Sequence, residues 1–390
     1  MRILHTSDWH LGRTFHGHSL EDDHEAFLEW LLEEAKRRQV AAVVVAGDVY
    51  DRAIPSADTM RLLEKTFEAF ADAEVPLVVS SGNHDSPIRL GFGGRFHERG
   101  GIHLRTTVAD LDRPVVLDDE HGPVGVYGIP YLLPDAVMAE LDAERSHQSV
   151  LTAAVKRIRE DASTRGLSRI VVLSHAFITG GQGSDSERDI RVGGIADASA
   201  DVFEGITYVA LGHLHGRQTV TSPFPTTTLA YSGSPLPFSF SERNHTKSVS
   251  VVDINGSGEV GIEHIDVPVG RALAEARGPF EQLLARAEGD LSHLADKWVR
   301  VVLTDPGRVL DAMEHFRAHW PHTVEIGFEP EGGLVDEDVD LDRLRRTTDP
   351  VEICASFVHY VGGERPTPAE SHVLRDAVEH AQRPEETTSR

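Results

Sequence analysis

Val-Ala-Ala-Val-Val-Val-Ala-Gly-Asp-Val-Tyr-Asp, residues 40–51, contains the pattern that decides the fold of this chain. Seven apolar residues in a row are typical of a strand that is buried on both faces of a sheet. Two carboxylates, Asp48 and Asp51, follow this run directly. Four further segments repeat the arrangement, with a metal-binding side chain where a predicted strand ends. They are Asp8-Trp9-His10, Gly82-Asn83-His84-Asp85, Ser174-His175 and Gly212-His213-Leu214-His215.

The five segments together predict a dinuclear metal centre. Their carboxylate, carboxamide and imidazole groups are enough for two cations, and two cations about 3.5–4 Å apart can clamp an in-line displacement at phosphorus. Such a pair needs a bridging carboxylate, and Asp48 at the end of its strand is the natural candidate. We expect one coordination sphere to be completed by Asp8, His10 and His215, and the other by Asn83, His175 and His213.

The donor types narrow the choice of metal. Mixed imidazole, carboxylate and carboxamide ligation suits manganese, iron or zinc better than magnesium or calcium. Alternation along an extended segment puts His213 and His215 on the same side, so that they can serve two neighbouring ions. Seven ligands over two metals leave positions open for water and substrate, as a catalytic site requires.

A histidine beside the predicted ligands is the expected catalytic group. His84 follows the ligand Asn83, and a protonated imidazole there would stabilise a phosphorane or protonate the leaving alkoxide. Asp51 would orient this imidazole by accepting its other N–H, although a purely structural turn carboxylate is the alternative. We expect Asp85 to cap the following turn before Pro87. The chain has 22 histidines, so any one of them alone is more readily a surface or structural residue, and the metal prediction depends on the whole set.

Composition limits the class of protein and its partners. A chain of 390 residues is expected to hold two or more domains. It contains no stretch near the roughly 18 apolar residues of a membrane span and no signal-peptide core at its start. Its single cysteine, Cys354, excludes an intramolecular disulfide, and we expect a cytoplasmic protein. The formal net charge of −25 repels a polyanion, so either the substrate is not nucleic acid or a partner supplies part of the binding.

Residues 1–270 alternate strand and helix patterns. Apolar runs between turn residues predict strands, and apolar residues at helical spacing predict helices. The expected strands are 2–6, 40–46, 75–80, 170–173, 208–211 and 228–232, with a hairpin of 247–254 and 260–267. The expected helices are 22–38, 56–72 and 133–165, the last broken near Ser146. We therefore expect an α/β (α+β) fold, with two stacked mixed β-sheets flanked by helices and the metal site at one edge.

Beyond Pro268 the pattern changes, and we expect two further regions. Residues 271–340 form a small α+β domain, with helices at 280–287 and 306–319, strands at 298–304 and 323–329, and an acidic linker at 329–342. Residues 341–390 hold two short amphipathic helices, 350–361 and 368–383, and a polar tail after Pro384 that we expect to be disordered. Two helices this short cannot bury both apolar stripes against each other. They either pack on their own chain or dock onto a partner helix or coiled coil.

The five segments, longer stretches around four of them and one further stretch resemble a known family. These stretches are Met-Arg-Ile-Leu-His-Thr-Ser-Asp-Trp-His-Leu-Gly at 1–12, Ala-Gly-Asp-Val-Tyr-Asp-Arg at 46–52, Ser-Gly-Asn-His-Asp-Ser at 81–86, Ala-Leu-Gly-His-Leu-His at 210–215 and Tyr-Ser-Gly-Ser-Pro-Leu-Pro-Phe-Ser-Phe at 231–240. The catalytic motifs resemble the calcineurin-like metallophosphoesterase superfamily. Residues 1–12 and 231–240 are similar, more narrowly, to the SbcD group, the nuclease subunits of bacterial SbcCD complexes. The resemblance covers essentially the whole chain.

This resemblance implies a reaction and the residues that perform it. Two manganese ions would be held, one by Asp8, His10, Asp48 and His215 and the other by Asp48, Asn83, His175 and His213. His84 and Asp51 occupy the positions of the family's catalytic histidine and its orienting partner. Members act in DNA repair, recombination and replication, as ATP-dependent 3′→5′ exonucleases on double strands and as endonucleases on single strands and hairpins.

The resemblance also implies an assembly. Residues 271–340 would be a capping domain that helps to hold DNA, and the last two helices would dock onto the coiled coil of an SbcC-type ATPase. Two nuclease subunits would form a homodimer within a heterotetramer, with helix 56–72 as part of the interface, in a cytoplasmic and nucleoid-associated complex. An acidic nuclease chain that its partner delivers to DNA would tolerate weak intrinsic affinity. Tyr50, Arg52 and the glycine-rich segment 180–183 depart mildly from the family pattern.

Two other functions are compatible with the motifs. One is a phosphodiesterase or phosphatase for small molecules or nucleotides on the same scaffold, but such an enzyme needs neither the extra domain nor the two amphipathic helices. The other is a catalytically silent scaffold that organises the ATPase. It is disfavoured because every expected ligand and His84 are present.

Overall fold

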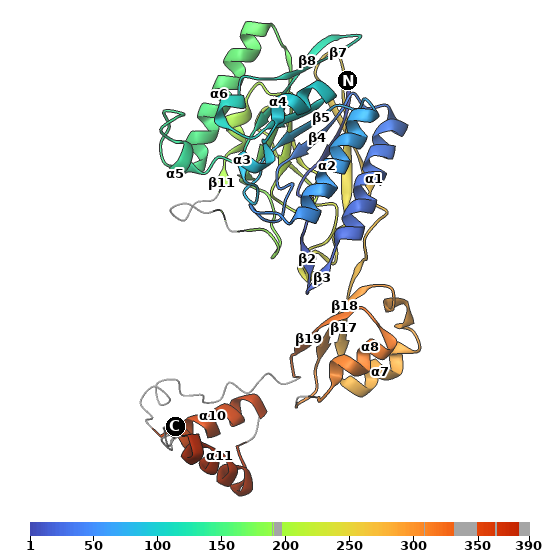
Figure 1. Cartoon of the computed structure of the whole chain (residues 1–390), viewed down its shortest axis with the longest axis vertical. Coiled ribbons are helices and arrows are strands. Elements are labelled where there is room, and N and C mark those ends of the chain that lie inside the picture. The colour runs from blue at the N-terminus through green and yellow to red at the C-terminus, as the bar shows by residue number, and fades with distance from the viewer. Residues whose placement is uncertain (189, 191–196, 308, 331–348, 363–364, 382–390) are drawn as a thin grey trace, which may run out of the picture. The chain divides into compact units, whose positions relative to one another are not determined.

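The structure of the chain is a computed structural model that describes residues 1–188, 190, 197–307, 309–330, 349–362 and 365–381. The chain divides into two compact units, Met1–Gly270 and Arg271–Arg390. Figure 1 shows the elements of each unit. Within the described ranges no helix is long and apolar enough to cross a membrane. Most of the predicted acidic linker and the whole tail after Pro384 lie outside the described residues.

The first unit contains two six-stranded mixed sheets. The first has the strand order β16-β15-β1-β4-β5-β6. Its strands are β1 Arg2–Thr6, β4 Ala42–Ala46, β5 Leu77–Ser80, β6 Ile102–Arg105, β15 Ser248–Ile254 and β16 Val260–Asp266. The second has the order β13-β14-β12-β9-β8-β7. Its strands are β7 Val115–Asp119, β8 Gly122–Ile129, β9 Arg169–His175, β12 Tyr208–Gly212, β13 Gln218–Val220 and β14 Thr228–Tyr231.

Within each sheet, the strands that carry the motif segments run parallel to one another. In the first sheet β4 lies between β1 and β5 and pairs with both in parallel. In the second sheet β9 and β12 are parallel partners. Antiparallel pairing is found toward the sheet edges, and it includes the predicted β15–β16 hairpin. Because neighbouring parallel strands end on the same side of a sheet, the segments that follow these strands are brought together there.

Alternating side chains along the strands build a four-layer structure. On β4, Val44 and Ala46 belong to the core between the two sheets. Val43 and Val45 point the other way, into a core shared with α1 (Glu21–Arg38) and α2 (Ala57–Asp72). The outer face of the second sheet packs in the same way against α6 (His147–Arg165). This arrangement confirms two stacked mixed sheets flanked by helices, visible in Figure 1.

Capping serines mark where two of the helices begin. The Ser56 hydroxyl accepts the backbone N–H of Thr59 at the start of α2, and the Ser146 hydroxyl accepts that of Ser149 at the start of α6. The break near Ser146 is therefore confirmed, but the expected helix before it is wrong. Only α5 is helical there, and residues 138–146 form turns around Asp142, whose φ of 49° no helix accepts. The remaining short elements are α3 Pro87–Leu90, α4 Gly94–His97, α5 Pro134–Val137, β2 Thr14–Phe15, β3 His18–Ser19, β10 Phe177–Ile178 and β11 Asp197–Ala198.

The second unit begins with a small parallel sheet of order β17-β18-β19. Its elements are β17 Leu273–Gly278, α7 Phe280–Ala287, β18 Trp298–Leu303, α8 Ala312–His319 and β19 Thr323–Phe328. Phe316 and Trp320 are buried in its core. The helix expected from residue 306 begins only at Ala312, because Asp311 has a left-handed backbone with φ 54°. Strand β17 was not predicted.

The last two described helices, α10 Pro350–Gly362 and α11 Pro368–Ala381, contact each other. Their mutual contact leaves large apolar side chains in solvent, namely Ile353, Phe357 and Val373. This agrees with the expectation that neither stripe is fully buried by the other helix.

Candidate metal centre

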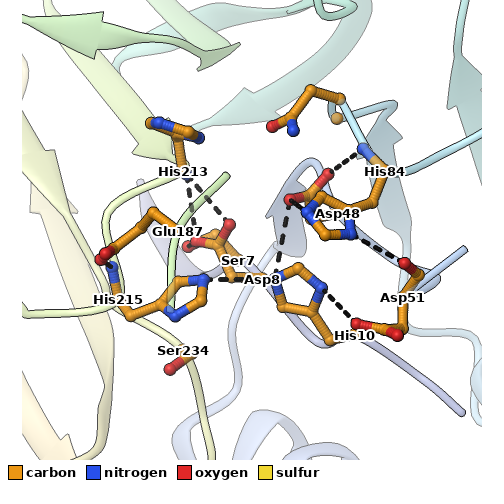
Figure 2. Close-up of polar contacts among 12 residues, drawn as sticks. Ser7, Asp8, His10, Asp48, Asp51, His84, Glu187, His213, His215 and Ser234 are labelled. Atoms are coloured by element: carbon orange, nitrogen blue, oxygen red, sulfur yellow. Dashed lines mark hydrogen bonds and ion pairs between the residues drawn. The ribbon is translucent and has the colours of Figure 1, made fainter. Parts of the chain in front are cut away.

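The five motif segments meet at the ends of five strands from both sheets of the first unit. The backbone N–H of Asp8 donates to Gly47 O at 3.0 Å, and that of His10 donates to Asp48 O at 3.0 Å. The second sheet is joined to them through His213, whose backbone N–H donates to Asp8 Oδ1 at 3.0 Å. Segments that are up to 205 positions apart in the sequence thus share one buried cluster, which Figure 2 shows.

One side of the cluster is formed by His10 and His215. Their Nε2 atoms lie 3.2 Å apart, and His10 Nε2 lies 3.6 Å from Asp48 Oδ2. The donor atoms of Asp8, His10 and His215 all lie within 4.8 Å of one another, so one ion can contact all three. All four side chains are almost fully buried.

The other side is formed by His175 and Asn83. His175 Nε2 lies 2.8 Å from Asn83 Oδ1 and 3.4 Å from Asp48 Oδ2. The donor atoms of Asp8, Asp48 and His175 also lie within 4.8 Å of one another. Asp48 therefore stands between the two histidine groups, as a bridging ligand would, and Asp8 reaches both sides as well.

His213 differs from the other predicted ligands. Its backbone N–H reaches Asp8, while its imidazole ring lies beside that of His175, with the ring centroids 5.3 Å apart. The ring is not part of the tight donor groups found among the described residues. Its backbone φ of 103° is far from ordinary strand values. The ligand role of His213 therefore stays a prediction.

Three motif glycines are needed because other groups occupy the space of a side chain. A Cβ on Gly82 would overlap the Asp48 carboxylate, and one on Gly47 would overlap the His175 ring. A Cβ on Gly212 would overlap the carbonyl oxygen of Ala46. The glycines in Gly-Asp, Gly-Asn and Gly-His thus allow the two sheets and the ligands to approach closely.

Several ligands also have unusual backbone conformations. Asp8, His10 and Asp48 have φ values of 53°, 48° and 51°. Non-glycine residues rarely adopt this left-handed region, and such residues concentrate at functional sites. At each of these residues the left-handed backbone turns the chain away from the line of the preceding strand and directs the side chain into the cluster.

The electrostatics of the cluster lack positive charge. Burial, together with the charge of Asp48, raises the pKa of Asp8 well above its usual value, and burial also raises the pKa of Asp48. Burial lowers the pKa of His175 to about 4 and lowers that of His10 still more strongly in combination with neighbouring imidazoles. His10 and His175 are therefore neutral with free lone pairs, and the carboxylates lack a counter-ion. A divalent cation would accept the imidazole lone pairs and would balance the charge of the carboxylates.

The hydrogen bonds of His175 test whether the donors fit a metal. Its Nδ1 lies 3.0 Å from Ala46 O, which can only accept, so Nδ1 carries the proton. Nε2 then has a lone pair, and it faces the carbonyl oxygen of Asn83 at 2.8 Å. Two acceptors at this distance repel each other unless a cation lies beside them. Asn83 Nδ2 has no hydrogen-bond partner among the described residues, so nothing else fixes this carboxamide.

A second network behind His215 was not predicted. His215 Nδ1 lies 2.6 Å from Ser186 Oγ, which donates to Glu242 Oε1 at 2.5 Å. Because the single hydroxyl proton goes to the carboxylate, Ser186 accepts from Nδ1–H and leaves the Nε2 lone pair toward His10. Burial raises the pKa of Glu242, but its bonding partners and the charge of Lys247 outweigh this and bring it to about 2.

Lys247 and Glu187 complete this network. The buried Lys247 ammonium forms an ion pair with Glu242 and donates to His215 O at 3.0 Å. Glu187 Oε1 accepts the backbone N–H of His215 at 2.8 Å. Such outer partners orient metal-binding histidines. No local motif marks them, and the only sequence signal is that Glu242 follows closely on the distinctive segment 231–240.

The contact between Asp51 and His84 differs from the expected one. His84 Nδ1 lies 2.7 Å from the main-chain carbonyl of Asp51, which therefore accepts the N–H. The Asp51 carboxylate instead lies 3.3 Å from Arg13 Nη1 and 3.5 Å from His10 Nδ1, as Figure 2 shows for His10. His84 Nε2 is left facing Asp48 Oδ2 at 4.0 Å.

Asp85 does not cap the next turn as expected. Its carboxylate accepts the backbone N–H groups of Gly82, Val49 and Tyr50, while Ser86 caps α3. Asp85 thus ties the segment after β5 to the segment after β4. Burial and the charge of Asp48 raise its pKa to about 7.

Comparisons with known proteins agree with this geometry. The calcineurin-like phosphoesterase model matches residues 1–217, and the model described as type 5 capsule protein repressor C-terminal domain matches residues 269–359. A protein of Staphylococcus saprophyticus, named as the SbcD component of the SbcCD nuclease, is 29% identical over 377 residues, covering 95% of this chain and 96% of that protein. A protein of the same name from Staphylococcus epidermidis is 27% identical over 329 residues, covering 84% of this chain and 85% of that protein.

Solved structures are more distant. TT1561 of Thermus thermophilus is 15% identical with a TM-score of 0.40, covering 67% of this chain and 98% of that chain. The calcineurin-like phosphoesterase YfkN of Bacillus subtilis is 14% identical with a TM-score of 0.41, covering 70% of this chain and 92% of that chain. The family match of residues 1–217 spans more than half of the 390 residues. The chain therefore belongs to the calcineurin-like phosphoesterase family and is a hydrolase of phosphoester bonds.

Proposed function

We propose that this protein is the nuclease subunit of a two-protein DNA-processing complex and hydrolyses phosphodiester bonds with two divalent metal ions. The observation that carries this proposal is the buried Asp and His cluster around Asp48, within a chain that is similar over 95% of its length to the SbcD component of an SbcCD nuclease. Double-strand ends and hairpins are the proposed substrates. The complex would act in DNA repair, recombination and replication, in the cytoplasm at the nucleoid.

The proposed metals are two manganese ions. Asp8, His10 and His215 would hold one and Asn83, His175 and His213 the other, with Asp48 shared. Ions bound there would lower the pKa of water and neutralise charge on the phosphoryl oxygens. The mixture of imidazole, carboxylate and carboxamide donors favours manganese over magnesium.

His84 is the proposed catalytic residue. The Asp51 carbonyl holds Nδ1–H at 2.7 Å, which fixes the ring with Nε2 toward the cluster. Nε2 can carry a proton to the leaving oxygen, or donate to a charged phosphoryl oxygen. Burial lowers the pKa of His84 while the Asp48 carboxylate raises it, and a bound phosphate would favour the protonated form in the same way.

The second unit and the last helices would serve the partners. Residues 271–340 would cap the site and help to hold DNA. Helices α10 and α11 would dock onto the coiled coil of an SbcC-type ATPase, and the exposed Ile353, Phe357 and Val373 offer the apolar contacts for it.

A second copy of the chain would form a homodimer through α2 and its neighbours, within a heterotetramer. Met60 of α2 and Ile88, Phe92 and Phe96 of the α3–α4 region are exposed apolar side chains. The two regions are adjacent, because the Phe67 ring packs on that of His97 with centroids 5.5 Å apart. Exposed apolar groups of this kind mark interaction surfaces.

The function is tested by incubating the purified chain with Mn²⁺ and a hairpin oligonucleotide, with and without the coiled-coil ATPase and ATP. We expect cleavage of the hairpin with Mn²⁺ and ATP-dependent degradation of double-strand ends only with the ATPase. An Asp48→Asn variant serves as the inactive control. Hydrolysis of nucleotide monoesters without DNA cleavage would indicate a small-molecule phosphatase, and no hydrolysis in any reaction would indicate a scaffold.

A further inference from the structure

An open cavity of about 450 Å³ lies next to the proposed catalytic histidine. Its lining comes from four places in the sequence, namely the start of β2 with the residue before it, the segment after β4, the segment after β5 and the segment after β10. The lining residues are Arg13, Thr14, Asp51, Arg52, His84, Ser186, Glu187 and Arg188. Ligand-binding cavities usually measure roughly 300–1,000 Å³, so this one has room for a group of nucleotide size.

The charge of this cavity is opposite to that of the chain. Three guanidinium groups line it against two carboxylates, whereas the whole chain has a formal charge of −25. The Glu187 carboxylate is already bonded to the backbone N–H groups of Ser184 and His215. Asp51 is shared between Arg13 and Arg52, at 3.3 Å and 3.7 Å. Positive charge is thus in excess at the surface that opens onto His84.

Arg13 is held in place inside the cavity. It donates to Asp51 Oδ1 and to Ser186 O, both at 3.3 Å, and its guanidinium lies 4.6 Å from the centre of the Phe238 ring. Its side chain is only 17% exposed. Arg13 is therefore held in one position, where it orients the Asp51 carboxylate and adds positive potential to the cavity.

Arg52 and Arg188 are the exposed arginines of this cavity. The Arg52 side chain is 80% exposed and touches Asp51 at only one distant atom pair. Arg188 is also exposed and lines the same cavity. Guanidinium groups bind phosphate through two parallel N–H donors, with charge assistance.

We propose that Arg52 and Arg188, supported by Arg13, bind the backbone phosphate of a DNA strand that lies next to the phosphate being cleaved. This inference rests on the proposed nuclease function, because only a polynucleotide presents a second phosphate beside the reacting one. The site would set the register of the strand at the metal centre, and it would explain how so acidic a chain can hold DNA locally. A substrate with a single phosphodiester would gain nothing from it.

Two substrates distinguish binding of the neighbouring phosphate from hydrolysis at the metal centre. The full chain with Mn²⁺ is assayed on bis(p-nitrophenyl) phosphate, which has one diester, and on a single-stranded oligonucleotide. We expect the Arg52→Ala, Arg188→Ala double variant to lose about tenfold or more in kcat/KM on the oligonucleotide beyond any loss on the small diester, mainly through KM. The salt dependence of log(kcat/KM) should also become shallower by about 0.7 for each phosphate contact removed from a single strand.

Arg37→Ala is the matched control, because Arg37 is an exposed arginine of α1 with a 64% exposed side chain. Its kcat/KM and salt dependence should equal those of the wild type on both substrates. Equal losses on both substrates in the double variant would assign the arginines to the metal centre and overturn the proposal. So would an unchanged oligonucleotide rate and salt slope. If the wild type hydrolyses the small diester but leaves every oligonucleotide intact, the nuclease function itself fails and this site fails with it.

Discussion

The position of His84 is fixed by a main-chain group. The Asp51 carbonyl accepts from Nδ1, so Nε2 is the only ring nitrogen that can face a substrate. Nε2 also lies close enough to Asp48 and His10 that the three donors form a compact group. The structure therefore allows two roles for His84, as a proton carrier or as a metal ligand, and substitution distinguishes them.

We expect His84→Ala to lower turnover of bis(p-nitrophenyl) phosphate by about 10²–10⁴-fold, the usual contribution of a general acid or base. Manganese content should stay at two ions per chain, measured by elemental analysis after dialysis. His121→Ala, at a 46% exposed histidine, is the control and should be fully active. Loss of an ion from the His84 variant would make His84 a ligand, and a near-normal rate would remove it from the reaction.

The orientation of His215 depends on the Ser186 hydroxyl, which links the imidazole to Glu242. We expect Ser186→Ala to weaken manganese binding by about 10–100-fold, the usual effect of losing an outer partner of a metal-binding histidine. Titration calorimetry with Mn²⁺ measures this without any turnover. Ser186→Thr keeps the hydroxyl and should retain most of the affinity. Equal affinities for the alanine variant and the wild type would show that the ring is fixed by its backbone contacts alone.

At the scale of elements, the site depends on how closely β12 of one sheet approaches β4 of the other. Gly212 ends β12 against Ala46 O of β4, where no Cβ fits. The parallel pairing of β9 with β12 then places Gly212 opposite His175. The glycine at the end of β12 thus sets the spacing between the ligands that follow the strands of the two sheets.

Gly212→Ala should therefore destabilise the fold by about 3 kcal/mol, through overpacking between the two sheets. It should also reduce manganese binding, because the sheets must separate to admit the methyl group. Chemical denaturation of the metal-free chain measures the first effect and calorimetry the second. Gly261→Ala in β16 is the control, since a Cβ there meets nothing within 4 Å. A Gly212 variant as stable as this control would contradict the close approach.

At the scale of the whole molecule, folding assembles an uncompensated negative charge. Asp8, Asp48 and Asp85 are buried together, and the pKa of each is raised, that of Asp85 to about 7. A carboxylate with a raised folded pKa contributes stability below its ordinary pKa and loses it as the pH rises through the folded value. His175 acts in the opposite direction, because its pKa falls to about 4, and its contribution is complete above 6.5.

Among these four buried groups, only the carboxylates therefore change the stability of the metal-free chain between pH 6.5 and 8, and they lower it. Mn²⁺ bound as proposed would compete with protons for Asp8 and Asp48 and would supply the missing charge. We expect the rise in Tm on adding Mn²⁺ to be larger at pH 8 than at pH 6.5, measured by calorimetry against a sample treated with a chelator. Asp48→Asn should abolish most of this rise. A rise that shrinks with pH would show that proton competition by carboxylates does not govern binding.

The sequence by itself determined the strands that carry the motif segments and the set of residues expected at their ends, but it did not predict β6, β7, β8, β13 or β17. The run 40–46 predicted a fully buried strand because valine and alanine on both faces leave no polar side, and β4 is fully buried. The strand-end residues from Asp8 to His215 predicted one cluster because parallel strands end together. The segments where the prediction was wrong, before Ser146 and before Ala312, contain Asp142 and Asp311 in left-handed conformations, which apolar periodicity does not reveal.

Only the tertiary structure decided how those side chains are aimed. It assigned the contact with His84 to the Asp51 carbonyl, left His213 out of the tight donor groups, and placed Asp85 between two strand ends. It also supplied Glu242 and Lys247, which no spacing connects to His215. The physical reason is that local sequence patterns encode burial and chain direction. The orientation of a side chain depends instead on backbone φ values and on packing between two sheets whose strands are distant in sequence.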